Sequence, residues 1–166
     1  MSSLLPVYSS REVQISFLEQ SITGVADNFA SIEQNSDFTD EAVGGFGEVG
    51  ISVNPDFTGM FELTLQQTSL TNKFLANVIL AQRKAKTIYR GDITLSDPSG
   101  GALVQLTNCH IKKGPTLGFG SQAQDRTWTI FCVDYTYLEL PEGMTEAAAA
   151  LGGIVGTVNT LSQFKV

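Results

Sequence analysis

The stretch Met60–Lys86, MFELTLQQTSLTNKFLANVILAQRKAK, decides the fold, because its hydrophobic period changes partway along. In its first part Phe61, Leu63 and Leu65 alternate with polar residues, which predicts a strand with one apolar face. After Ser69 the apolar residues recur every three or four positions, which predicts an amphipathic helix packed on a core. The residues expected to form the core face of this helix are Leu70, Phe74, Leu75, Val78 and Ile79.

The rest of the chain between Arg11 and Leu138 has the patterns of strands and turns. Strands are expected at residues 13–24, 25–34, 87–96, 103–112 and 126–138, the last being the longest. The clearest turn is Asp97-Pro98-Ser99-Gly100-Gly101, because proline presets one dihedral angle and glycine accepts a positive φ. We therefore expect a mainly β (α+β) fold, an antiparallel β-sandwich or barrel with one flanking α-helix and an extended hairpin loop.

The length of 166 residues allows one domain with a real core. We expect a flexible N-terminal arm at 1–10, a β domain at 11–140 and an Ala/Gly-rich docking tail at 141–166. The tail is uncharged from Ala147 to Phe164 but lacks the Leu, Ile and Phe density of a membrane span, so no membrane anchoring is expected. No signal peptide is evident, and Cys109 and Cys132 are expected to be reduced thiols on strands.

The segment Asp37–Pro55 differs from the strands around it, because glycines and acids separate its scattered apolar residues. This composition predicts a long extended hairpin or loop with little core of its own. Its letters from Gly45 to Gly50 match GxGxxG, but no buried strand precedes them and no helix follows, so a dinucleotide site is not expected. The candidate residues of this segment for contact with another copy of the chain are Asp40, Glu41, Val43, Phe46, Glu48, Val49 and Ile51.

Charge is unevenly distributed along the chain. Residues 1–72 hold ten acids and one base, whereas residues 73–126 hold eight bases and three acids. Oppositely charged faces would suit head-to-tail association, although folding can also interleave the two blocks. The candidate basic partner surface consists of Arg83, Lys84, Lys86 and Arg90. A net charge of −7 argues against a nucleic-acid patch and favours contact with the acidic face of a neighbour.

The residues that carry enzyme chemistry are scarce. His110 is the only histidine, and Cys109 beside it would point to the opposite face of a strand, so no catalytic dyad or triad can be built. The paired acids Asp40 and Glu41 lie in the glycine-rich segment, away from any apolar pocket that would raise a pKa. We expect no catalytic residues, no cofactor and no metal site.

Two motifs carry a family resemblance. Phe61-Glu62-Leu63-Thr64-Leu65 is followed by Gln67-Thr68-Ser69 at the helix start, and Arg126-Thr127-Trp128-Thr129-Ile130 lies in the last long strand. With this order of elements, residues 11–138 resemble the tail tube proteins of contractile-tailed bacteriophages. The resemblance implies a structural subunit whose hexameric rings stack into the inner conduit for DNA, driven through the host envelope by sheath contraction.

The same resemblance implies the partners and the location. The partners would be further copies of the chain, the tail sheath, the baseplate or initiator and terminator proteins, and tape measure protein and DNA held in the lumen without specific binding. The chain would be found in the virion tail, and in the host cytoplasm during assembly. Two alternatives stay open: a ring subunit of a tailocin or type VI-like secretion tube, and a monomeric small-ligand-binding β-barrel.

Overall fold

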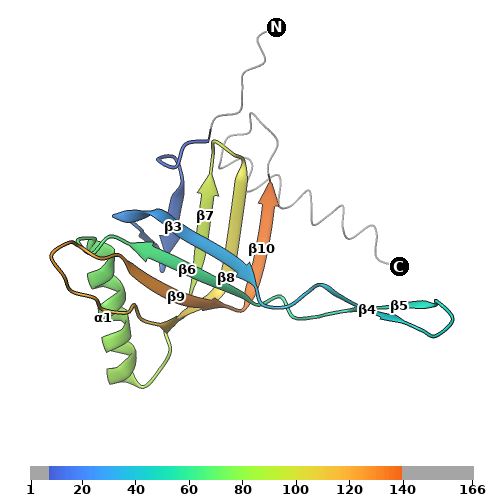
Figure 1. The fold of residues 1–166 in the computed structure, drawn as a ribbon. Coiled ribbons are helices and arrows are strands. Elements are labelled where there is room, and N and C mark those ends of the chain that lie inside the picture. Colours follow the sequence, from blue (N-terminus) through green and yellow to red (C-terminus); the bar gives the residue numbers. More distant parts are fainter. Residues whose placement is uncertain (1–7, 140–166) are drawn as a thin grey trace, which may run out of the picture.

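The computed structural model describes residues 8–139, which form a mainly antiparallel β fold with one helix (Figure 1). The predicted fold class is confirmed. Residues 1–7 of the predicted arm and the predicted tail beyond residue 139 lie outside the described residues. The elements are β1 (Gln14–Phe17), β2 (Gln20–Ser21), β3 (Val25–Gln34), β4 (Thr39–Val43), β5 (Val49–Val53), β6 (Gly59–Leu65), α1 (Leu70–Ala85), β7 (Gly91–Asp97), β8 (Ala102–Lys113), β9 (Arg126–Cys132) and β10 (Asp134–Glu139).

Eight of the strands belong to one folded sheet, in which seven follow the order β2-β1-β7-β8-β9-β6-β3 and β10 pairs with β8 beside this path. The sheet folds at β8, because the first half of this strand pairs with β10 and its second half pairs with β9. Figure 1 shows the result as two layers, in which β3, β6 and β9 cross β7, β8 and β10 at a steep angle. The sheet does not close into a barrel, and β4 and β5 pair separately as a projecting hairpin.

The core lies between these layers, and β6 supplies its centre. Phe61, Leu63 and Leu65 are fully buried while Glu62 is exposed, which confirms the predicted alternation. Trp128 faces Leu63 across the β6–β9 pair and is also buried. Each large apolar side chain buried in this way contributes about 1.5–3 kcal/mol relative to an exposed one.

Helix α1 covers one end of the sheet and starts at a capped residue. The Ser69 hydroxyl accepts a hydrogen bond from the Thr71 amide at 3.2 Å and donates one to the Thr23 carbonyl at 2.5 Å, so the cap also ties the helix to the segment before β3. The helix ends at Lys86, which has the left-handed conformation common after a helix and donates its amide to the Gln82 carbonyl.

The predicted core face of α1 is right for most of its residues and wrong for Leu70. Leu75 is fully buried, and Phe74 and Ile79 are half-buried against the core. Val78 is also half-buried. Leu70 is 70% exposed. It precedes Leu75 by five residues, which places it about 140° around the helix from the buried face.

Residues 13–24 form a hairpin, so the single strand predicted there is wrong. Strands β1 and β2 are joined by Leu18 and Glu19, both with positive φ (51° and 62°). Such a two-residue turn usually contains asparagine or glycine, and this sequence therefore gives no signal for it. The Leu18 side chain lies directly over Gly91, which has no side chain to obstruct it.

Two further strand boundaries differ from those predicted. The segment 126–138 is interrupted at Val133, where the chain leaves its partner β6 and continues as β10 along β8. The longest strand is therefore β8, with twelve residues. Strand β7 begins at Gly91 instead of residue 87, and Ile88 before it is exposed.

Candidate assembly surfaces

The β4–β5 hairpin projects from the body of the molecule, as Figure 1 shows, and every residue of its two strands is exposed. Opposed residues of an antiparallel pair share a face, as do residues two apart along a strand. The pairs Val43 with Val49, Glu41 with Ile51, and Thr39 with Val53 therefore line one face. The hairpin thus has one largely apolar face with a single carboxylate, that of Glu41.

This geometry divides the predicted inter-ring contact residues. Glu41, Val43, Val49 and Ile51 lie together on the apolar face, whereas Asp40 lies on the opposite face. Sequence reasoning missed Val53, which continues the alternation beyond Ile51 and would have been found by extending that pattern.

The hairpin ends in a glycine-rich turn that carries the remaining two candidates, Phe46 and Glu48. The Gly44 amide donates to the Glu48 carbonyl at 2.7 Å, and Gly47 has a φ of 84° that favours glycine. Phe46 at the tip is 95% exposed. The GxGxxG letters therefore form a turn between two strands, and the helix that a dinucleotide site needs does not follow them.

Polar contacts fix the base of the hairpin. The Ser36 hydroxyl donates to Asp56 Oδ2 at 2.5 Å, and Asp56 Oδ1 accepts from the Thr58 amide at 3.0 Å. These bonds, led by the one from Ser36, lower the pKa of Asp56. The Asn54 amide also donates to the Phe38 carbonyl at 2.8 Å, so the two chains leaving the body are held together.

The residues of the predicted basic surface, Arg83, Lys84, Lys86 and Arg90, are all exposed. Arg83 and Lys86 line a groove of about 460 Å³ between the end of α1 and the end of β8. Arg90 lines a different pocket beside Leu18, and Lys84 lines neither. Lys112 and Lys113 also line the first groove. Sequence reasoning missed them because they are distant from α1 along the chain.

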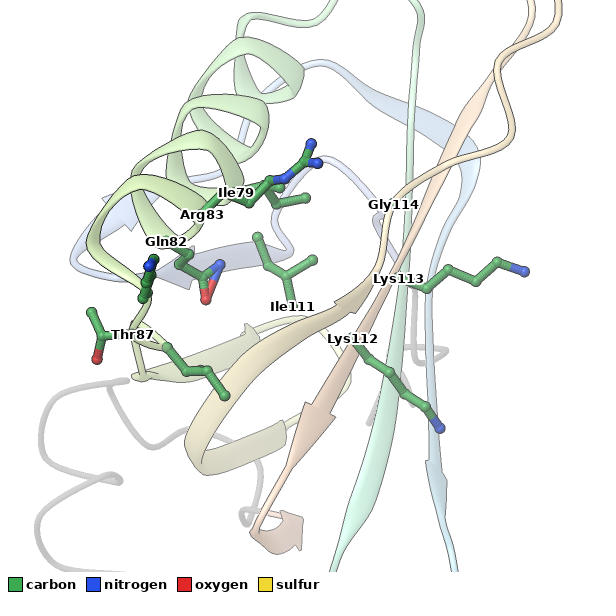
Figure 2. Close-up of a pocket in the computed structure, with 10 residues that line it drawn as sticks. Ile79, Gln82, Arg83, Thr87, Ile111, Lys112, Lys113 and Gly114 are labelled. Atoms are coloured by element: carbon green, nitrogen blue, oxygen red, sulfur yellow. The ribbon is translucent and has the colours of Figure 1, made fainter.

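These bases do not converge on one point. Figure 2 shows Ile79, Gln82 and Ile111 facing one another inside the groove, while Lys112 and Lys113 point away from α1. A compact anion would need several cations directed at one place. The surface is therefore suited to diffuse attraction of an acidic face.

The histidine, the cysteines and the acids of the described residues do not gather into a metal site. Residues 8–139 contain no cluster of three or more His, Cys, Asp or Glu side chains able to hold a metal ion. His110 is half-buried beside Phe131, with ring centroids 5.5 Å apart, and burial together with the nearby Arg90 lowers its pKa. Cys109 and Cys132 are free and buried on β8 and β9.

None of the helices in the described part of the chain is long and apolar enough to span a membrane.

Solved structures from contractile injection systems share this fold. The chain is similar to the tube terminating cap of the anti-feeding prophage, with a TM-score of 0.57 and 11% identity over 82% of this chain and 94% of that chain. It is also similar to the sheath/tube terminator of the extracellular contractile injection system PVC, with a TM-score of 0.56 and 13% identity over 82% of this chain and 99% of that chain. A chain of the PVC sheath-tube complex is similar as well, with a TM-score of 0.53 and 14% identity over 84% of this chain and 94% of that chain.

Sequence comparison identifies the family. Residues 7–138 match the model of the bacteriophage PhiTE tail tube protein family, and the chain therefore belongs to that family. The resemblance read from β6, the start of α1 and β9 is confirmed, and the chain is a structural tail tube protein. No curated protein matches it.

Proposed function

We propose that this chain forms hexameric rings that stack into the inner tube of a contractile phage tail, through which DNA passes when sheath contraction drives the tube into the host envelope. The observation that carries the proposal is the β4–β5 hairpin, which exposes an apolar face and pairs only with itself among residues 8–139. A two-stranded hairpin of this kind is marginally stable alone, so a second subunit is the natural cover for it.

The energetics favour ordering of the hairpin by a neighbour. Its exposed apolar side chains are those of Val43, Phe46, Val49, Ile51 and Val53. Burying each one fully is worth about 1.5–3 kcal/mol. Fixing the backbone costs about 1–2 kcal/mol per residue, and burial of these side chains against another subunit would offset part of that cost.

Ring closure requires a second type of contact, and the sheet offers edges for it. Strand β3 pairs only with β6, and β10 pairs only with β8, within the described residues. An exposed edge strand presents unpaired amide and carbonyl groups that can pair with another chain. We therefore expect neighbouring subunits in a ring to meet through these edges.

The partners follow from the function. Terminator and sheath-tube structures with this fold support contacts with sheath and terminator proteins, and a baseplate or initiator protein would start the stack. Tape measure protein and DNA would occupy the lumen without specific binding, because acidic walls repel phosphate. The assembled protein would lie in the virion tail and its free subunits in the host cytoplasm.

Negative-stain electron microscopy of the purified chain tests this proposal. Rings and stacked tubes are expected from the wild-type protein. Replacing residues 40–50 with a short Gly/Ser turn should remove the long tubes, because it removes Phe46 at the tip and two of the four apolar residues of the hairpin face, Val43 and Val49. The variant should unfold in urea at nearly the wild-type midpoint, because the replaced residues are exposed and contribute little to the core.

Two outcomes would contradict the proposal. A wild-type protein that remains monomeric at high concentration and binds a small apolar ligand saturably would favour a ligand-binding domain. A hairpin variant that polymerises at the wild-type concentration would show that stacking uses another surface. Native particles distinguish the phage tail from a tailocin or secretion tube, because only the phage particle packages DNA.

A further inference from the structure

A second apolar surface lies beside α1, opposite the projecting hairpin. The loop at residues 114–125 leaves a groove of about 550 Å³ between itself, α1 and β9, which we call the α1 groove. Its walls include Ala76 and Leu80 from the helix and Leu117 and Phe119 from the loop. Leu80, Leu117 and Phe119 are all exposed. Contiguous exposed apolar surface of this kind marks an interaction site more often than a free surface.

The α1 groove also contains an unsatisfied positive charge. Arg126 is only 8% exposed, and its Nη1 atom is buried without a hydrogen-bond acceptor among residues 8–139. The Phe119 ring lies over the guanidinium, 5.2 Å from Cζ to the ring centroid. Phe119 is itself 77% exposed, so a small shift of its ring would open the guanidinium to a ligand. Lys73 lines the same groove and adds a second positive charge.

These features specify the chemistry of what the groove would bind. A buried polar group without a partner is costly, and a guanidinium is satisfied best by a carboxylate, which can accept two parallel hydrogen bonds. The groove walls require apolar side chains next to that carboxylate. The complementary ligand is therefore an apolar strip that carries one acid.

The β4–β5 hairpin is such a strip. Its apolar face holds Val43, Val49, Ile51 and Val53, and Glu41 is the only carboxylate on that face. Figure 1 shows the hairpin and α1 at opposite ends of the molecule, so the hairpin of a chain cannot reach its own α1 groove. A contact between two different surfaces of identical subunits repeats head to tail and generates rings or filaments.

We propose that the α1 groove receives the β4–β5 hairpin of a second copy of this chain, with the apolar face against Leu80 and Leu117 and the Glu41 carboxylate on Arg126. This proposal rests on the proposed tube function, and it identifies the α1 groove as the surface that receives the hairpin. Of the bases suggested by the sequence, Arg83, Lys84, Lys86 and Arg90 all lie outside this groove. The partner charges are those of Arg126 and Lys73.

Disulfide trapping in assembled tubes tests this contact. A chain with Val49→Cys and Leu117→Cys should form a ladder of cross-linked subunits on a non-reducing gel after mild oxidation. Neither single variant should form more than traces of dimer, because the native Cys109 and Cys132 are fully buried. The matched control pairs Val49→Cys with Lys86→Cys, at the basic end of α1, and should form no ladder.

A charge reversal tests the proposed ion pair. Glu41→Arg should raise the concentration needed for tube assembly by at least about tenfold, equivalent to about 1.4 kcal/mol. Asp40→Arg is the matched control, because it makes the same charge change on the opposite face of the hairpin and should assemble near the wild-type concentration. Equal effects of the two reversals would overturn the ion pair with Arg126.

The outcomes separate this contact from the proposed function. A wild-type chain that forms neither rings nor tubes overturns both. Tubes that form normally from the Val49→Cys, Leu117→Cys chain but give no ladder overturn the contact alone, as does a ladder from the Lys86→Cys control. A disulfide between Leu117→Cys and Phe164→Cys would assign the groove to the C-terminal segment of the chain and would likewise overturn the proposal.

Discussion

The contribution of α1 to stability can be tested by comparing two leucines of the same helix. Leu75 has no exposed surface and packs in the main core cluster, whereas Leu70 is 70% exposed. Truncating a buried leucine loses the transfer free energy of the removed atoms and leaves a cavity, so Leu75→Ala should destabilise the fold by about 2–5 kcal/mol. Leu70→Ala removes the same atoms from a side chain in contact with water and should change stability by less than about 0.5 kcal/mol.

Urea unfolding of the unassembled subunit measures both values. Trp128 is the only tryptophan, is buried, and donates its indole N–H to Asn72 of α1 at 2.9 Å, so its fluorescence reports the contact between helix and sheet. The slope of the unfolding free energy with urea should stay unchanged in both variants, since neither alters the surface exposed on unfolding by much. A loss below about 1 kcal/mol for Leu75→Ala, or an equal loss for Leu70→Ala, would refute the assigned orientation of the helix.

Three further predictions concern protonation, thiol access and charge. The pKa of His110 in the folded protein lies below its usual value of 6.5. The contribution of neutral His110 to the free energy of unfolding is therefore complete above pH 6.5 and decreases as the pH falls below that value. His110→Gln should therefore lessen the stability lost between about pH 7.5 and 5.5, as denaturant midpoints would show. Cys109 and Cys132 are buried, and their mutual hydrogen bond raises the pKa of Cys132, so rapid labelling of native protein by a thiol reagent would contradict the fold. Acids from residues 1–72 should line the tube lumen, and a map with a lysine- or arginine-lined lumen would disprove this.

Sequence periodicity was sufficient for some features of the molecular surface and insufficient for others. The composition of Asp37–Pro55 predicted an exposed hairpin, since glycines and acids cannot build a core. Strand pairing then decided that Glu41 shares a face with Ile51 and that Asp40 does not, because pairing register assigns every side chain to one face. Closeness along the chain is a similarly limited guide for the basic residues, since Arg83 and Arg90 near the end of α1 line different grooves.

The sequence by itself determined the elements whose signals are local. The two-residue alternation of β6, the Ser69 cap of α1 and the turn at residues 97–101 each depend on neighbours within a few positions, and all three are present in the fold. Only the tertiary structure decided the break at Val133, because β8 is shared between β9 and β10 and no residue near Val133 encodes that exchange. The tertiary structure also determined the composition of the α1 groove. Arg126 and Phe119 meet Leu80 there only after the sheet has folded, since burial and charge pairing depend on contacts between residues far apart in sequence.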